Sequence, residues 1–384
     1  MALLAQTPPM GFNTWNTFGA NIDEKMVMEM ADVIVEKGYK DAGYQYVVID
    51  DCWSLRERNE DGELVPDPAK FPHGMKYVGD YIHSKGLKFG MYSCAGIRTC
   101  AGFPSSFDHE FQDARTFASW GVDFLKYDFC YFPSFANCRH RYLQMAQALR
   151  ASGRDILFSA CNWGAQEPWN WMRSVGAHMY RSTGDIFDNF NSTANIAKSQ
   201  MDKFNANAAG CFNDMDMLTV GMNGAGNVGS GTEANTYNEY EFEFGYWCFC
   251  ASPLMMGADL RKVDDKYRTL LQNPGLIALN QDKECRPPYL VRNENGWTLW
   301  VRHLANGEFA IGVFNFADGD RWAEVTFAEL GVPVNSGVRL DITDVITGEK
   351  LGLKKDDMFF PVKAHSCKIF RAKFVPEKRR RAAK

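Results

Sequence analysis

The stretch Phe124-Leu-Lys126-Tyr-Asp128 is a short apolar run that ends in a lysine and an aspartate two positions apart. Four more apolar runs end in acidic or aromatic clusters, and they cover residues 46–53, 178–185, 212–217 and 254–259. A buried strand does not need a carboxylate at its carboxyl end, and desolvating one is costly unless it is paired. Repeating this arrangement around a barrel places many carboxylates at one mouth, where the active sites of TIM barrels lie.

The apolar runs are spaced like the strands of such a barrel. Strands are predicted at residues 11–15, 45–50, 88–92, 124–128, 156–161, 178–181, 212–217 and 253–256. Amphipathic helices are predicted between them, at residues 22–37, 75–85, 110–120, 139–151, 193–205, 237–250 and 262–272. Eight strands separated by helical segments predict an α/β fold, a (β/α)8 TIM barrel that occupies residues 1–284.

The pattern changes after a polar segment at residues 280–288. Short alternating runs follow, separated by Asn, Gly and Asp turns, at residues 297–302, 309–316, 323–327, 338–341 and 367–372. Such runs are typical of an antiparallel β-sandwich, which we predict for residues 285–376. The basic tail at residues 377–384 is predicted to be a disordered, solvated end.

Length, charge and composition limit the function. The chain has 384 residues, which exceeds what one hydrophobic core usually supports, and a net charge of −5. This charge argues against nucleic acid or an anionic membrane as a partner. The first residues lack the basic segment of a signal peptide, and no apolar run is long enough to span a membrane. We expect a cytoplasmic protein, or a secreted one if a signal peptide has been removed, and leave open whether it forms a homo-oligomer.

Metal and cofactor chemistry are not predicted. The eleven cysteines include no C-x-x-C pair, and none of the seven histidines is spaced as H-x-H or H-x-x-x-H. Zinc sites usually show such ligand spacing. We therefore expect neither a metal nor a cofactor.

Lys126 and Asp128 are the first candidates for chemistry. Residues two apart in a strand point to the same face, so both side chains would project into the barrel near its mouth. An ammonium beside a carboxylate favours the ionised acid, which a glycosidase nucleophile requires. The alternative is a structural ion pair between Lys126 and Asp128 at a strand end.

Arg181 and Asp185 follow another predicted strand. Gly184 permits a turn that can bring Asp185 back over the barrel, where it would face Asp128. Two such carboxylates are the nucleophile and proton donor of glycoside hydrolysis. The alternative is that Asp185 is a loop residue that caps the next helix.

Four further groups of residues have weaker signals. The adjacent carboxylates Asp50 and Asp51 need donors or ligands, so they could hydrogen-bond several hydroxyls. Trp15, Trp53 and Trp163 follow strand ends and could stack on sugar rings, although a single tryptophan is more often a core residue. The favoured interpretation of Asp214 and Asp216 is structural hydrogen bonding to loop amides. The Gly-rich run at residues 221–231 lacks a P-loop ending and fits a flexible loop on top of the barrel.

These motifs, in this order, resemble those of glycoside hydrolase family 27, the α-galactosidase (melibiase) and α-N-acetylgalactosaminidase family. The resemblance spans essentially the whole chain. The stretches that carry it include Pro8-Pro-Met-Gly-Phe-Asn-Thr-Trp15, Ile49-Asp-Asp-Cys-Trp53, Trp120-Gly-Val-Asp-Phe-Leu-Lys-Tyr-Asp128, Cys161-Asn-Trp-Gly164 and Phe212-Asn-Asp-Met-Asp-Met-Leu218.

The resemblance implies a retaining double displacement on a terminal, non-reducing α-galactosyl unit. By position, Asp128 matches the nucleophile and Asp185 the acid/base of the family. The resemblance further implies a set of substrate-binding residues. Asp50 and Asp51 match the carboxylates that hold galactose O4 and O6, Lys126 and Arg181 match contacts to the other ring hydroxyls, and Trp15 and Tyr92 match the aromatic lining.

The same resemblance bears on the cysteines and on the choice of sugar. Cys100 and Cys130 match a disulfide of secreted members, but other disulfide positions are not reproduced, which fits a reducing compartment and leaves this pair open. The substrate-binding segment Cys161, Asn162 and Trp163 would surround the 2-substituent, and we favour galactose. The alternatives are α-N-acetylgalactosaminidase, β-L-arabinopyranosidase, or a sugar-binding protein without catalysis.

Overall fold

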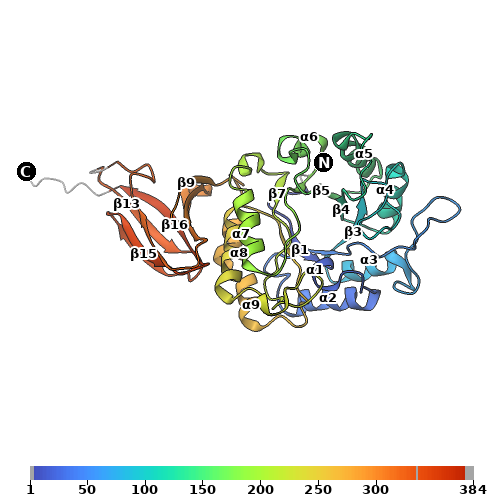
Figure 1. Ribbon diagram of the computed structural model, residues 1–384, viewed down its shortest axis with the longest axis horizontal. Coiled ribbons are helices and arrows are strands. Elements are labelled where there is room, and N and C mark those ends of the chain that lie inside the picture. Colours follow the sequence, from blue (N-terminus) through green and yellow to red (C-terminus); the bar gives the residue numbers. More distant parts are fainter. Residues whose placement is uncertain (1–3, 334–335, 377–384) are drawn as a thin grey trace, which may run out of the picture.

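The computed structural model describes residues 4–333 and 336–376. The predicted basic tail at residues 377–384 lies outside the described residues. A barrel of strands and helices forms one part of the molecule, and an elongated set of strands forms the other (Figure 1).

Eight parallel strands form the barrel, in the neighbour order β7-β6-β5-β4-β3-β2-β1-β8. Their bounds are β1 (Met10–Asn13), β2 (Tyr46–Val48), β3 (Lys88–Cys94), β4 (Phe124–Asp128), β5 (Leu157–Cys161), β6 (Met179–Arg181), β7 (Phe212–Asp214) and β8 (Leu254–Met256). The ring closes through Leu218, whose backbone N–H donates to the Met255 carbonyl (2.7 Å) and whose carbonyl accepts from the Gly257 N–H (2.9 Å). The structure thus confirms the predicted TIM barrel.

Helices alternate with these strands. They are α1 (Trp15–Phe18), α2 (Glu24–Glu36), α3 (Gly74–Ser84), α4 (Glu110–Ser119), α5 (Cys138–Ala151), α6 (Met172–Val175), α7 (Phe190–Ser199), α8 (Tyr237–Phe249), α9 (Asp265–Leu271) and α10 (Pro274–Asn280). Several begin where a side chain accepts from the first turn, as Asp23 does from the Met26 N–H and Asn137 from the His140 N–H. Helices α1, α6 and α10 are short and were not predicted.

Strand β7 ends earlier than predicted. The sequence analysis extends it to Met217, but the strand stops at Asp214 because Asp216 adopts a backbone φ of 97°. An extended strand requires a negative φ, so the chain leaves the sheet at this point. The turn keeps Asp216 at the mouth of the barrel.

The C-terminal part is the predicted antiparallel β-sandwich. A six-stranded sheet has the order β14-β13-β16-β11-β10-β9, and β12 pairs with β15 in a second sheet. The bounds are β9 (Tyr289–Glu294), β10 (Trp297–His303), β11 (Glu308–Asn315), β12 (Arg321–Val325), β13 (Val338–Asp344), β14 (Lys350–Lys354), β15 (Met358–Val362) and β16 (Cys367–Pro376). Strands β9, β14 and β15 were not predicted, because the largely exposed β9 and β14 show little apolar alternation.

The sandwich packs directly against the barrel. Phe314 of β11 contacts the rings of Phe242 and Tyr246 of α8, with ring centroids 5.5 and 4.9 Å apart. The buried guanidinium of Arg302 in β10 donates to the Cys248 and Leu279 carbonyls at the ends of α8 and α10 (3.3 and 3.0 Å). Unsatisfied carbonyls at helix ends favour such a cation. The boundary near residue 284 remains a prediction, since strand β9 begins only at Tyr289.

Among the described residues, no helix has the length and apolar character needed to cross a membrane.

Candidate active site

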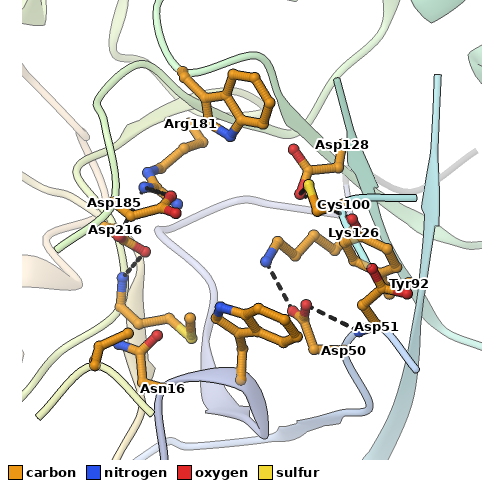
Figure 2. Close-up of a pocket in the computed structure, with 14 residues that line it drawn as sticks. Asn16, Asp50, Asp51, Tyr92, Cys100, Lys126, Asp128, Arg181, Asp185 and Asp216 are labelled. Carbon is orange, nitrogen blue, oxygen red and sulfur yellow. Dashed lines mark hydrogen bonds and ion pairs between the residues drawn. The ribbon is translucent and has the colours of Figure 1, made fainter. Parts of the chain in front are cut away.

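A polar pocket lies at the carboxyl end of the barrel strands (Figure 2). Most of the predicted substrate-binding and catalytic residues line it. The lining consists of Trp15, Asn16, Asp50, Asp51, Tyr92, Cys100, Lys126, Asp128, Trp163, Arg181, Asp185, Asp216, Met217 and Val228. Side chains from seven strands and the segments that follow them therefore meet in one place, as the strand-end pattern of the sequence predicts.

The two carboxylates after β2 are buried and are held by donors on different sides. Asp50 accepts hydrogen bonds from the Asn13 amide (2.7 Å) and the Lys126 ammonium (2.8 Å). Asp51 accepts from the backbone N–H of Ala101 (2.9 Å) and of Cys52 (2.7 Å). Burial raises the pKa of the Asp51 carboxyl, while these backbone donors oppose the shift. The donors that the adjacent charges need are thus present without a bound ligand.

The lysine of β4 binds a different carboxylate from the one expected. Lys126 forms its ion pair with Asp50 across the barrel, so the structural pair with Asp128 considered above is not the one observed. Burial lowers the pKa of the Lys126 ammonium, but Asp50 and Asp128 outweigh it and the net shift is upward. Lys126 therefore remains a cation between the two carboxylates.

Asp128 ends β4 as a buried carboxylate. One oxygen accepts from the backbone N–H of Phe129 (2.9 Å), and the other accepts from the Tyr92 hydroxyl (3.1 Å). Burial raises the pKa of the Asp128 carboxyl, and the Lys126 charge is the largest effect that opposes it. The expected stabilisation by Lys126 is therefore present, but burial is stronger. These two hydrogen bonds fix the orientation of the carboxylate, which suits a nucleophile.

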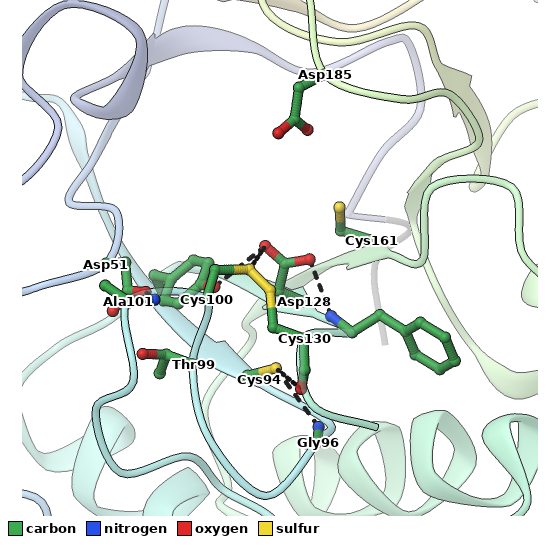
Figure 3. The surroundings of a disulfide bond; sticks show 12 residues. Asp51, Cys94, Gly96, Thr99, Cys100, Ala101, Asp128, Cys130, Cys161 and Asp185 are labelled. Carbon is green, nitrogen blue, oxygen red and sulfur yellow. Dashed lines mark hydrogen bonds between the residues drawn. A yellow bond between two sulfur atoms is a disulfide. The ribbon is translucent and has the colours of Figure 1, made fainter. Parts of the chain in front are cut away.

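Asp185 lies on the opposite side of the pocket, and its carboxylate turns toward Asp128 (Figures 2 and 3). Its side chain is 63% exposed and accepts a hydrogen bond from Arg181 NH2 (2.8 Å). The alternative role as a helix cap does not apply, since Asn189 caps α7 by accepting from the Ser192 N–H. Gly184 was expected to permit this turn, and the turn does not require glycine, because its φ lies outside the left-handed region and a Cβ there would meet open space.

Asp216 is a site residue that the sequence analysis did not select. The structural bonds predicted for Asp214 and Asp216 are present: Asp214 accepts from the Asp216 N–H (2.9 Å), and Asp216 accepts from the N–H groups of Met217 (2.7 Å) and Ile186 (2.8 Å). Asp216 also binds Arg181 NH2 at 2.8 Å and lines the pocket. Its position after a strand end, shared with Asp50 and Asp128, was the available signal.

The carboxyls of Asp185 and Asp216 have pKa values shifted in opposite directions. Burial raises the pKa of the Asp185 carboxyl, but Arg181 and Lys126 outweigh it and hold that pKa below its usual range. Burial also raises the pKa of Asp216 to about 6, against the effect of Arg181. In the free protein, Asp185 therefore has the lower pKa of these two carboxyls and loses its proton first.

The end of β5 and the loop after it carry three predicted residues with different placements. Trp163 lines the pocket and adopts a left-handed φ of 56°. Asn162 is fully buried, and its amide donates to the Ala165 carbonyl (2.5 Å), so it is not part of the lining. Cys161 lies below the pocket in an adjoining cavity shared with Lys126 and Arg181. Their substrate-binding role remains a prediction.

A disulfide joins Cys100 and Cys130 beside the nucleophile candidate (Figure 3). The sequence left this pair open. Cys100 Sγ lies 3.6 Å from an Asp128 oxygen, and the neighbouring Ala101 donates to Asp51. Gly96 allows the close approach, because a Cβ there would overlap the Cys130 carbonyl. The remaining cysteines are free and buried.

Three further pocket residues were not among the predicted site residues. They are Asn16, which lies in α1, and Met217 and Val228, which lie in the segment after β7. Val228 belongs to the Gly-rich segment, whose backbone is tied to α1 by a bond from the Val228 N–H to the Asn16 carbonyl (3.0 Å). The one grouping of potential metal ligands among the described residues is Cys100, Asp128 and Cys130, and both of its sulfurs belong to the disulfide. That donor set does not fit a thiolate metal site.

A pocket lined by carboxylates at the carboxyl end of a (β/α)8 barrel, with two acidic groups facing each other, defines a glycoside hydrolase. Residues 7–282 match the family model described as alpha galactosidase A. Residues 294–372 match the model described as alpha galactosidase C-terminal beta sandwich domain. The chain belongs to the α-galactosidase (melibiase) family, glycoside hydrolase family 27.

Individual relatives agree with this assignment. The chain is 40% identical over 368 residues to an α-galactosidase of Cyamopsis tetragonoloba, covering 96% of this chain and 86% of that protein. It is 37% identical over 372 residues to α-galactosidase A of Homo sapiens, covering 91% and 84%. The crystal structure of α-galactosidase I from Mortierella vinacea is similar with a TM-score of 0.91 at 33% identity, covering 97% and 98%. These relatives do not favour the N-acetylgalactosaminidase or arabinopyranosidase alternatives.

Proposed function

We propose that this chain is a retaining exo-α-galactosidase, which removes terminal, non-reducing α-D-galactosyl residues from oligosaccharides or glycoconjugates. The observation that carries the proposal is the pair of carboxylates facing each other across the pocket, one buried and fixed, the other exposed and paired with an arginine. The membership of an α-galactosidase family supports the choice of substrate.

In this proposal Asp128 attacks the anomeric carbon and Asp185 protonates the departing oxygen. The attack forms a glycosyl ester on Asp128, and the leaving group takes the proton of Asp185. Asp185, now a carboxylate, then accepts a proton from water, which hydrolyses the ester and releases galactose with its α configuration retained. The ammonium of Lys126 and the guanidinium of Arg181 both lower the pKa of the two carboxyls, so they favour the carboxylate form that attacks in the first step and accepts a proton in the second.

The closed end of the pocket suits one galactosyl unit. Lys126 holds the carboxylate of Asp50, and the Ala101 N–H holds that of Asp51. Their oxygen atoms therefore have fixed positions to which several sugar hydroxyls could hydrogen-bond. Trp15 and Tyr92 supply aromatic surface at the same end. We assign these residues, with Arg181 and Trp163, to substrate binding.

The first test is hydrolysis of p-nitrophenyl α-galactoside, followed by NMR of the galactose formed before the anomers equilibrate. The proposal predicts turnover with α-galactose as the first product. No turnover would support a sugar-binding protein, and β-galactose as first product would show an inverting mechanism. The expected compartment stays a prediction from the sequence.

A further inference from the structure

Asp216 occupies a strained backbone position in the wall of the pocket. Its φ of 97° is unfavourable for a residue with a side chain, and the carboxylate is buried. Strain of this kind persists only where surrounding contacts hold it, and it often marks a functional site. The contacts of Asp216 show which groups this backbone conformation brings together.

Both contacts of one Asp216 oxygen lead to the neighbourhood of Asp185. Oδ2 accepts from the backbone N–H of Ile186 (2.8 Å), the residue directly after Asp185. The same oxygen pairs with Arg181 NH2 (2.8 Å), and this nitrogen also donates to Asp185 Oδ1 (2.8 Å). Figure 2 shows Arg181, Asp185 and Asp216 together on one side of the pocket.

We propose that Asp216 is a positioning residue for the proton donor: it holds the Asp185 loop through Ile186 and divides the Arg181 guanidinium between two carboxylates. The proposal rests on the proposed function, because it assumes that Asp185 must gain and lose a proton.

The division of Arg181 has a chemical consequence for Asp185. The donor must carry a proton in the first step and lose it before the second. An arginine that paired with Asp185 alone would favour the carboxylate, whereas a second anion on the same nitrogen reduces that preference. Asp216 therefore makes it easier for Asp185 to hold the proton.

The other charged groups near Asp185 and Asp216 do not reduce the preference of Arg181 for the Asp185 carboxylate in the way that Asp216 does. Asp185 faces Arg181, Lys126 and the Cys161 thiol as well as Asp216. Asp216 also faces Asp214 and Glu243, and burial raises the pKa of both of these carboxyls, that of Glu243 to about 8. The two cations near Asp185 both favour its carboxylate, and Asp216 is the anion that shares its nearest cation.

The test compares Asp216→Asn with Asp259→Asn. Asparagine keeps the size of the side chain, tolerates a positive φ and can still accept from Ile186, but it carries no charge. Asp259 is a matched control, since it is a largely buried strand-end carboxylate paired with Arg261 (2.8 Å) and does not line the pocket. Both variants are assayed on p-nitrophenyl α-galactoside and on an α-galactosyl disaccharide across pH.

In Asp216→Asn, Arg181 pairs with Asp185 alone and the donor loses its proton at lower pH. We expect the alkaline limb of kcat/KM to move down by about one pH unit. The disaccharide, whose leaving oxygen is basic, should lose about tenfold more activity than the nitrophenyl substrate. Asp259→Asn should change neither the position of the alkaline limb nor the relative activity on the two substrates. An unmoved limb with equal losses on both substrates would overturn the proposal.

A second measurement keeps the proposal testable if Asp216→Asn does not fold. The wild-type protein is labelled with ¹³C at the aspartate carboxyls and titrated by NMR, and Asp185→Asn identifies the Asp185 signal. The proposal predicts that the Asp216 titration changes when Asp185 loses its charge, since the two share one cation. Independent titration would overturn it. Absence of wild-type α-galactosidase activity would instead contradict the proposed function, and the titration can still be measured.

Discussion

The two sides of the pocket hold their carboxylates in different ways. The nucleophile side, made of Asp50, Asp51, Lys126 and Asp128, is buried and bonded to backbone amides and to a lysine. The donor side, made of Arg181, Asp185 and Asp216, has two carboxylates on one guanidinium nitrogen, and Asp185 is 63% exposed. A group that attacks carbon needs a fixed position, whereas a group that exchanges a proton with a leaving group and then with water needs access and an adjustable pKa.

The largest effect is expected on the nucleophile side. Asp128→Asn should lose activity by at least roughly 1,000-fold, because an amide cannot form the glycosyl ester. The chain should still fold, since Asn can accept from the Phe129 N–H in the same way. Steady-state kinetics and circular dichroism measure the two quantities, with Asp259→Asn as the control for loss of a buried charge. Activity within tenfold of wild type would remove Asp128 from its role.

A smaller and more selective loss is expected on the donor side. Asp185→Ala should lower kcat/KM by roughly 100-fold or more on an α-galactosyl disaccharide, and much less on a nitrophenyl substrate. Protonation matters only when the departing oxygen is basic. Kinetics on a series of aryl galactosides of different acidity measures this dependence. Equal losses along the series would assign Asp185 to binding alone.

The disulfide links the two halves of the nucleophile side, because Ala101 beside Cys100 holds Asp51 while Cys130 follows Asp128. Replacing both Cys100 and Cys130 by alanine should lower kcat/KM by about tenfold through looser positioning. It should also lower the free energy of unfolding by about 3 kcal/mol, as expected for closure of a loop of this length. Cys211→Ala, a buried free cysteine outside the pocket, is the control. Unchanged kcat/KM would show that the other contacts alone fix Asp51.

The exposure of Asp185 predicts a difference between the free and the occupied enzyme. Arg181 and Lys126 hold the pKa of its carboxyl low in the free protein, and a bound galactosyl unit excludes water from it. Desolvation favours the neutral acid, so the donor keeps its proton to higher pH in the complex. The alkaline limb of kcat should therefore lie at higher pH than that of kcat/KM, by about one unit. Coincident limbs would contradict this account of Asp185.

The smallest effect concerns the 2-substituent of the sugar. We expect α-galactosides to be preferred over α-N-acetylgalactosaminides by at least about tenfold, as a steric effect of pocket size. Asn162 does not line the pocket, and it supports the Trp163 turn by its bond to the Ala165 carbonyl. Asn162→Ser should narrow the preference by only a few-fold, by loosening that turn. A wild-type preference for the acetamido sugar would contradict the choice of galactose.

The strand-end pattern of the sequence was sufficient to predict the barrel and most of the pocket. Each apolar run ends at the same mouth, so Asp50, Lys126, Asp128 and Arg181 had to meet there. Pairing could not be predicted in the same way, because Lys126 lies two residues from Asp128 in sequence but binds Asp50 across the barrel. Spacing along one strand says nothing about the neighbouring strand.

The donor side was less predictable for the same physical reason. The role of Asp216 depends on a positive φ and on a shared arginine nitrogen, and neither leaves a mark in the sequence. Asn16 in α1 and Val228 in the Gly-rich segment reach the pocket through a long-range backbone bond between them. The exposed strands β9 and β14 were missed because their side chains alternate little between core and solvent.

The assignment of the two carboxylates is tested most directly by the configuration of the product formed with azide. In Asp128→Gly the nucleophile is missing, so azide should attack the anomeric carbon directly and give β-galactosyl azide. In Asp185→Ala the glycosyl ester still forms from an activated aryl galactoside, so azide should open it and give α-galactosyl azide. NMR of the anomeric proton distinguishes the two products. Opposite configurations in the two variants are the predicted result, and the same configuration in both, or the reverse assignment, would contradict a nucleophile at Asp128 and a proton donor at Asp185.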